Sequence, residues 1–121
     1  MNKITSFTDL NAWKESHKLV LAIYRLVKSF PKEEKFGLSS QITRAVISIT
    51  SNIAEGFARQ TKKEKRQFYY TAKGSLVEVE NQLLIARDIG YLSKKNFGTI
   101  ADQAVVADKL ITGLIKAVGD M

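Results

Sequence analysis

The sequence predicts an all-α protein, an antiparallel four-helix bundle with an up-down-up-down order of helices. Three observations lead to this class. Apolar residues recur at spacings of three and four along most of the chain, as they do in a helix that buries one face. Residues that start and end helices divide the chain into four segments of similar length. The connections between these segments are short, and short connections make consecutive helices antiparallel neighbours.

The first helix is expected to begin near Asp9 or Asn11 and to end by about residue 29. Pro31 is the chain's one proline, and it disfavours helical backbone at Phe30. Two adjoining apolar rows cover about half of this helix, and we expect them to face the core. The rows consist of Trp13, His17, Val20, Tyr24 and Val27, and of Ala12, Leu19, Ile23, Leu26 and Phe30.

The second helix is expected between Gly37 and Gly56, where the residues allow two interpretations. The stretch RAVISITSNI is rich in β-branched residues and would suit a buried strand. It lacks period-two alternation, however, and a single strand would have no partner. Because its apolar residues share one face at helical spacing, we predict a helix. These residues are Leu38, Ile42, Ala45, Ile49 and Ile53.

The third and fourth helices are marked by capping residues. Thr61-Lys62-Lys63-Glu64 has the form of a capping box, which predicts a helix that starts there and ends near Gly90. Ser93 can cap a fourth helix that runs to about Val118, before Gly119. The predicted core row of the third helix is Phe68, Ala72, Ser75, Val79, Leu83 and Ala86, and that of the fourth is Phe97, Ile100, Ala104, Ala107, Ile111, Leu114 and Val118.

Length and composition indicate one globular domain, residues 1–121. The chain has a mass of 13.6 kDa, with 45% hydrophobic and 26% charged residues, which is typical of soluble domains. The first twenty residues are interrupted by polar side chains, so they do not resemble a signal peptide. No apolar run is long enough to span a membrane. We therefore expect a cytoplasmic protein without a membrane partner.

The residue types used by most enzymes are scarce. The chain has no cysteine and one histidine, whereas a di-iron bundle needs two Glu-x-x-His pairs. The histidine, His17, lies in an apolar row and is expected to be a core or boundary residue. No nucleophile paired with a base is evident, and GFARQTKK lacks the glycines of a P-loop. We expect a non-enzymatic protein without metal or cofactor.

Charged residues near the core faces are expected to pair with each other. Glu78 is one of the carboxylates closest to these faces, with Arg44 and Arg59 as basic candidates. A buried charge is costly unless an opposite charge neutralises it. We therefore predict a structural ion pair between helices, formed by Arg44 and Glu78 or by Arg59 and Glu78.

Positive charge is concentrated in the first part of the chain. The net charge is +7, and residues 1–75 hold fourteen basic and six acidic residues, against five and six in residues 76–121. A surface of this kind attracts polyanions such as nucleic acid, although an acidic protein partner is the alternative. One cationic track runs along the first helix, and a denser cluster spans the start of the third. The track is Lys14, Lys18, Arg25 and Lys28, and the cluster is Arg59, Lys62, Lys63, Lys65 and Arg66.

The position of the denser cluster favours phosphate binding. Cations at a helix N-terminus oppose the helix dipole by about 0.3–1 kcal/mol each, so helix stability does not explain them. Free N–H groups beside lysine and arginine form an anion site that suits a sugar-phosphate backbone. We expect structured RNA or DNA to bind here without base reading. Among the aromatic residues that follow, Tyr69 is the candidate for stacking on a base, with a packed position as the alternative.

A second apolar stripe lies opposite the core row of the third helix. Tyr70, Val77 and Leu84 are seven residues apart on a face that should contact water, and Ile47 is placed similarly on the second helix. A line of apolar residues on the outside of a bundle is unfavourable in water. We predict that a second copy of the chain covers it. The alternative is a third helix enclosed by its own domain.

Several segments resemble the four-helix bundle family of 23S rRNA intervening sequences, also called S23-type. The resemblance rests on Asp9-Leu10 with Trp13, the segment FPKEEKFGLSSQITRAVISITSNIAEG, Arg59, AKGSLVEVENQL, and Gly90-Tyr91-Leu92. It covers about residues 9 to 92. Thr50 departs from the pattern, because proline is frequent there in these proteins.

The resemblance implies a specific assembly and role. It implies an up-down bundle that forms a homopentamer, and the chain is also similar to the accessory variability determinant of diversity-generating retroelements. That likeness implies a nucleic-acid-binding scaffold or adaptor, with a reverse transcriptase or another nucleic-acid enzyme as a partner. The match places Arg44 and Arg59 in the family pattern, with Lys62, Lys63 and Arg66 beside it.

Overall fold

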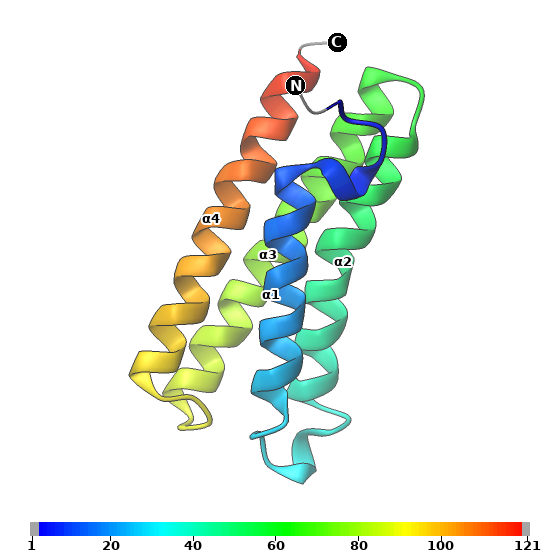
Figure 1. The fold of residues 1–121 in the computed structure, drawn as a ribbon. Coiled ribbons are helices and arrows are strands. Elements are labelled where there is room, and N and C mark those ends of the chain that lie inside the picture. The colour runs from blue at the N-terminus through cyan, green and yellow to red at the C-terminus, as the bar shows by residue number, and fades with distance from the viewer. Residues whose placement is uncertain (1–2, 120–121) are drawn as a thin grey trace.

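The computed structural model describes residues 3–119 and contains four long helices (Figure 1). No strand occurs within these residues, so the helical prediction for RAVISITSNI is confirmed. The predicted domain, residues 1–121, extends two residues beyond the described range at each end. The elements are η1 (Phe7–Asp9), α1 (Asn11–Val27), η2 (Lys32–Glu34), α2 (Leu38–Ala58), α3 (Lys62–Asp88) and α4 (Lys94–Val118), where η denotes a short 3-10 helix.

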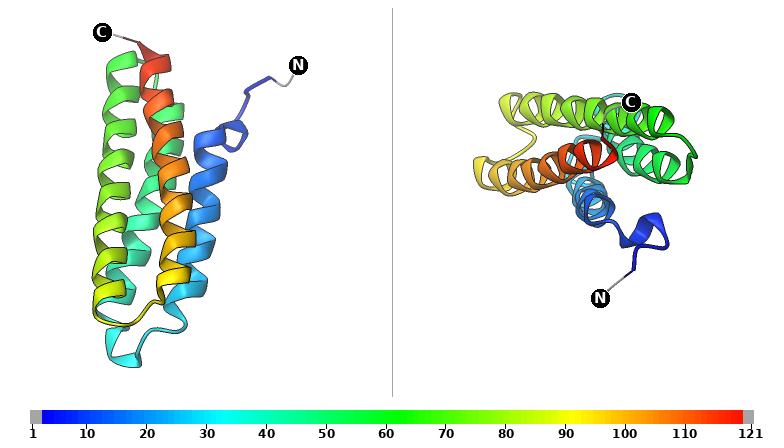
Figure 2. Two further views of the ribbon diagram at one scale, coloured as in Figure 1. Left: turned by 90° about the vertical axis from the view of Figure 1, so that its left-hand side faces the viewer. Right: turned by 90° about the horizontal axis from the view of Figure 1, so that it is seen from above.

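The helices pack as a closed ring of four neighbours. α1 packs against α2 and α4, and α3 packs against α2 and α4 on the other side. The views along and across the bundle show the predicted up-down-up-down order (Figure 2). The α2–α3 connection therefore lies at the same end as the start of α1 and the end of α4, and we call this the α2–α3 end. The other two connections lie at the opposite end.

Each helix begins and ends close to the predicted residues. Thr61 Oγ1 accepts a hydrogen bond of 3.2 Å from the backbone N–H of Glu64, and Ser93 Oγ accepts one of 3.1 Å from Asn96. Gly90 has a φ of 88°, a conformation that favours glycine and ends α3. Thr61 and Ser93 thus cap α3 and α4 as predicted, but the capping box is incomplete, because Glu64 accepts a bond from the Thr61 hydroxyl instead of its backbone N–H.

The core rows of α1, α2 and α4 are largely as predicted. Every apolar residue of the second predicted row of α1 is buried, and Trp13, Val20 and Val27 are half-buried beside it. Tyr24 is an error, because 47% of it is exposed. The buried residues of the α2 and α4 rows are Ile42, Ala45, Ile49, Ile53, Ile100, Ala104, Ala107 and Ile111.

The core row of α3 differs from the prediction by one residue at two positions. Tyr69 and Leu76 are buried, whereas the predicted Phe68 and Ser75 are only half-buried. The cause is a close approach between α2 and α3 near Gly56. A Cβ built on Gly56 would lie 2.6 Å from Cε1 of Tyr69, so the missing side chain makes room for this ring.

Candidate nucleic-acid interface

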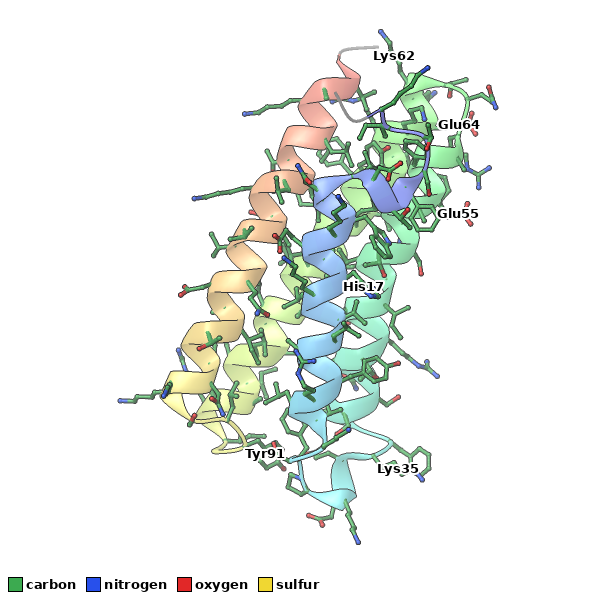
Figure 3. The ribbon with its side chains drawn as sticks, in the orientation of Figure 1. His17, Lys35, Glu55, Lys62, Glu64 and Tyr91 are labelled. Atoms are coloured by element: carbon green, nitrogen blue, oxygen red, sulfur yellow. The ribbon has the colours of Figure 1, made fainter. Side chains whose placement is uncertain are left out.

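The α2–α3 end brings together the five cations predicted as the main binding cluster. Lys62 and Lys63 occupy the first turn of α3 and are exposed. Lys62 extends from this end of the bundle (Figure 3). Glu64 Oε1 accepts a hydrogen bond of 2.9 Å from the hydroxyl of Thr61. Within residues 3–119, neither Lys62 nor Lys63 forms an ion pair, so both ammonium groups are available to a ligand.

Lys65 and Arg66 bind backbone carbonyl groups of neighbouring helices. Lys65 Nζ donates a hydrogen bond of 2.8 Å to the carbonyl of Phe57, in the last turn of α2. Arg66 Nη1 donates one of 2.7 Å to the carbonyl of Gly119, next to the last turn of α4. Cations are favourable at helix C-termini. Contrary to expectation, stabilisation of helix ends therefore explains the positions of Lys65 and Arg66.

Their positive charges are nevertheless not neutralised. The partner of each is an uncharged carbonyl, and neither residue forms an ion pair with a carboxylate in the described part of the chain. Lys65 and Arg66 are half-buried rather than enclosed. They add to the positive field around Lys62 and Lys63, although their side chains are held in place.

Arg59 has a mixed environment. Its Nη2 lies 3.0 Å from Oε2 of Glu55, one helical turn earlier, and its guanidinium lies 4.7 Å from the centre of the Phe68 ring. Glu55 is thus an ion-pair partner of Arg59. We therefore regard Arg59 as a residue that fastens the α2–α3 connection to Phe68, and not as a principal phosphate ligand.

Tyr69 is not available to stack on a base. Only 2% of it is exposed, and this burial raises the pKa of its phenol. The packed alternative is thus confirmed. Spacings of three and four fit a row through Tyr69 and Leu76 as well as the predicted row through Phe68 and Ser75, so periodicity alone did not distinguish them.

The predicted cationic track on α1 is discontinuous. Lys14 and Arg25 are exposed and form no ion pair among the described residues, whereas Lys18 lies 3.3 Å from Glu15. Arg25 borders a groove of about 410 Å³ between α1 and α4. Lys28 lies just beyond the end of α1 and borders a different groove, between α1 and α2. Both grooves lie at the end of the bundle opposite the α2–α3 end.

The predicted ion pair between Arg44 and Glu78 is absent. Both residues are exposed, so neither charge needs a buried partner, and no ion pair joins them within residues 3–119. Glu78 instead accepts a hydrogen bond of 3.3 Å from Gln82 Nε2. The alternative pair of Glu78 with Arg59 is also wrong, because Arg59 binds Glu55. An ion pair that the sequence did not indicate joins α3 to α4, where Lys73 Nζ lies 2.7 Å from Oδ1 of Asp108.

Sequence reasoning missed a basic groove at the opposite end of the bundle. This groove, of about 580 Å³, lies between the end of α1 and the start of α2, and we call it the α1–α2 groove. Lys32 and Lys35 were overlooked because Glu33 and Glu34 separate them and make the segment KEEK neutral in a charge count. The groove is bordered by four cations and one exposed aromatic ring, namely Lys28, Lys32, Lys35, Arg44 and Phe36.

The predicted apolar stripe is exposed in the single chain. The exposed fractions are 51% for Tyr70, 57% for Val77, 41% for Leu84 and 40% for Ile47. The alternative, a third helix enclosed by its own domain, is therefore wrong. Leu84 also borders a small groove of about 140 Å³ against α4, with Val105 on the other side.

Potential metal ligands are scattered in the described part of the chain. No group of three or more potential His, Cys, Asp or Glu ligands occurs within residues 3–119. His17 is half-buried and stacks on Trp13, with 4.6 Å between the ring centres.

No helix of the described chain is long and apolar enough to cross a membrane.

Comparison with known proteins identifies a family and solved structures with a similar fold. The sequence profile of the family described as "23S rRNA-intervening sequence protein" matches residues 8–113. A crystal structure from Bacteroides thetaiotaomicron, described as a protein with unknown function from the S23 ribosomal protein family, is similar with a TM-score of 0.80 and 25% sequence identity. The similarity covers 87% of this chain and 95% of that one. A search of curated proteins found no match.

Proposed function

This chain belongs to the family of 23S rRNA-intervening sequence proteins, and from that premise we propose that it is a non-enzymatic, basic protein that binds structured RNA or DNA. It binds through the sugar-phosphate backbone and serves as a scaffold or adaptor of a ribonucleoprotein in the cytoplasm. Several copies of the chain, five as the family resemblance implies, assemble through the apolar stripe.

The observation that supports this proposal is the unneutralised charge at the α2–α3 end. Lys62 and Lys63 project from the first turn of α3 without carboxylate partners in the described chain, and Lys65 and Arg66 lie directly behind them. Across the molecule, only four of the nineteen lysines and arginines form ion pairs within residues 3–119, which leaves fifteen without one. Such a surface attracts a polyanion and releases its counterions on binding.

The proposed binding reads shape rather than sequence. Lysine ammonium groups bind phosphates as point charges, and contacts to phosphate position a nucleic acid without specifying its bases. Assembly of several copies would present the same basic end repeatedly, and linked sites raise the overall affinity without new contacts. A structured RNA with closely spaced phosphates is the ligand that matches this surface.

The test is the salt dependence of RNA binding by a Lys62→Gln/Lys63→Gln variant. If both lysines contact phosphates of duplex RNA, the slope of log affinity against log salt becomes shallower by about 1.8 per subunit. Arg66 is left intact, because its bond to Gly119 makes it part of the fold. Fluorescence anisotropy with a labelled RNA hairpin over a series of salt concentrations measures the slope.

The matched control is Lys94→Gln/Lys95→Gln. These two exposed lysines also occupy the first turn of a helix, α4, but lie at the opposite end of the bundle. Both double variants lower the net charge by two. If both reduced the salt dependence to a similar extent, RNA binding could not be assigned to the α2–α3 end. Absence of salt-dependent binding by the wild type to both an RNA hairpin and duplex DNA would reject the proposal and leave an acidic protein as the partner.

A further inference from the structure

We propose that the α1–α2 groove binds an unpaired nucleotide of a single-stranded segment, with its base stacked on Phe36 and its phosphates held by Lys28, Lys32, Lys35 and Arg44. This inference rests on the proposed function, because it adds a second site for the same class of ligand. It distinguishes two surfaces of the bundle, one for structured nucleic acid at the α2–α3 end and one for an unpaired strand at the opposite end.

The first observation is the exposure of Phe36. Its ring is 88% exposed, more than any other large hydrophobic residue of the described chain. A single exposed apolar residue is ordinary on a protein surface, so exposure alone would not indicate a site. Here, however, the ring borders a groove whose volume of about 580 Å³ is within the range of small-ligand sites.

The second observation is the charge around that ring. Four cations border the groove, and no carboxylate is among its lining residues. The ammonium of Lys35 lies 5.4 Å from the centre of the Phe36 ring. A positively charged groove beside an exposed aromatic face is the combination by which proteins bind single-stranded nucleic acid. The ring accepts the flat face of any base, and the cations follow the backbone.

The third observation is that the loop holding Phe36 is fixed. Glu34 Oε1 accepts a hydrogen bond of 3.0 Å from the backbone N–H of Leu38, and its Oε2 accepts one of 2.7 Å from the hydroxyl of Tyr91. These bonds connect the loop to the start of α2 and to the α3–α4 connection, and Tyr91 and Lys35 both lie at this end in Figure 3. Phe36 therefore projects from a braced loop, so stacking requires little ordering of the protein.

Glu34 keeps its negative charge but does not line the groove. The hydrogen bonds from Leu38 and Tyr91 hold the pKa of Glu34 below its ordinary value, so this carboxylate is ionised but satisfied within the loop. Gly37 permits this arrangement, since a Cβ there would lie 2.7 Å from Glu34 Oε1. Glu33 is exposed and does not line the groove.

The start of α2 adds backbone donors to the site. Ser39 and Ser40 lie in the first turn of α2 and border the groove. N–H groups in the first turn of a helix have no partner within that helix and favour an anion. The hydroxyl of Thr43, by contrast, is occupied by bonds of 2.8 and 3.0 Å to the carbonyls of Ser39 and Ser40. A phosphate at this end would thus meet both the helix N-terminus and Arg44.

The experiment compares Phe36 variants on two RNAs, a single-stranded uridine RNA and a blunt-ended duplex without unpaired bases. We expect Phe36→Ala to weaken single-strand binding by about fivefold or more, as loss of one base–aromatic stack does, and to leave duplex binding unchanged. Phe36→Trp should retain single-strand binding, and Phe36→Leu should not, because leucine keeps apolar area but has no aromatic face. The control is Tyr24→Ala, which removes an exposed aromatic ring from α1, outside the groove.

A second measurement reports stacking directly. A 2-aminopurine base in the single strand should lose fluorescence on binding the wild type and keep more of it on binding Phe36→Ala. Circular dichroism confirms that each variant folds, which is expected because Phe36 makes little contact with the core.

Four results would overturn the inference. Full single-strand affinity in Phe36→Leu would exclude stacking, and a lower assembly mass in Phe36→Ala would identify Phe36 as a contact between copies. Unchanged binding in all Phe36 variants, together with the altered salt slope of the Lys62→Gln/Lys63→Gln variant, would reject this site and leave the proposed function standing. Failure of the wild type to bind either RNA, or single- or double-stranded DNA, would reject both the inference and the proposed function.

Discussion

Gly56 illustrates how one missing side chain determines the contact between two helices. It lies in the last turns of α2, where the ring of Tyr69 packs against its backbone. Farther along the same contact, the hydroxyls of Ser48 and Ser75 are 2.8 Å apart. Small residues at these positions let α2 and α3 approach closely, which is why α3 buries Tyr69 instead of Phe68.

We predict that Gly56→Ala destabilises the protein, although alanine is the better helix former. The added Cβ would lie 2.6 and 2.8 Å from two carbons of the Tyr69 ring and 3.1 Å from Cβ of Phe68. Overpacking of this kind costs about 1–3 kcal/mol, which exceeds the gain of about 0.5–1 kcal/mol from replacing a helical glycine. Thermal or urea unfolding measures the free energy of unfolding.

Gly113→Ala provides the control for this prediction. Gly113 lies within α4, and a Cβ there would have no atom within 4 Å. The same change should therefore stabilise the protein by about 0.5–1 kcal/mol. If both variants were stabilised, the ring of Tyr69 would have to move freely, and the account of the α2–α3 contact would be wrong.

At the residue scale, the sequence predicts which side chains are charged but not what they contact. Lys65 and Phe57 are close in sequence, yet their contact depends on how the α2–α3 connection folds. Arg66 binds Gly119, which is 53 residues away, and this contact depends on the packing of the whole bundle. Exposure of Arg44 and Glu78 likewise follows from the rotation of α2 and α3, which periodicity defines only to about one residue.

At the element scale, the helices themselves were predictable because their determinants are local. Proline, the capping residues and the left-handed glycines act within a few residues, and each marks a helix boundary close to the observed one. The short loop around η2 was not predicted. Its conformation depends on the bond between Glu34 and Tyr91, which are far apart in sequence.

We predict at this scale that Lys65 stabilises the end of α2. Its ammonium lies 2.8 Å from the carbonyl of Phe57, where a cation complements the helix dipole. Lys65→Met preserves much of the apolar side chain and removes the charge, so the free energy of unfolding should fall by about 1 kcal/mol.

The neighbouring Lys63→Met is the comparison for Lys65→Met. Lys63 is exposed and has no hydrogen bond or ion pair in the described part of the chain. Its replacement should leave stability within about 0.5 kcal/mol of the wild type, as surface changes usually do. Equal losses in the two variants would show that the bond from Lys65 to α2 contributes nothing.

At the scale of the whole molecule, cationic and apolar residues occupy different parts of the surface. Cations lie at both ends of the bundle, whereas the exposed apolar residues of α3 lie along its length between them. Side-by-side association through that length would leave both ends free for nucleic acid. The sequence predicted the stripe because its residues are seven apart on one helix, and exposure of all four residues in the single chain supports the same arrangement.

We predict that several copies of the chain assemble through the apolar stripe, so that the mass in solution exceeds that of one chain. Tyr70, Val77 and Leu84 are exposed at seven-residue spacing on α3, and burying their apolar surface between copies is favourable by about 25 cal/mol for each Å² removed from water. The mass in solution should therefore be a multiple of 13.6 kDa, and about five times that value for the ring implied by the family resemblance. Val77→Glu should reduce this mass, because a carboxylate buried at the contact would have to lose its hydration. Val77 is 57% exposed in the single chain, so the variant should remain helical. Leu21→Glu introduces the same charge at an exposed position on α1 and should leave the mass unchanged. Sedimentation velocity at micromolar concentration separates these outcomes, and a wild-type mass equal to one chain would show that the stripe is not a contact between copies.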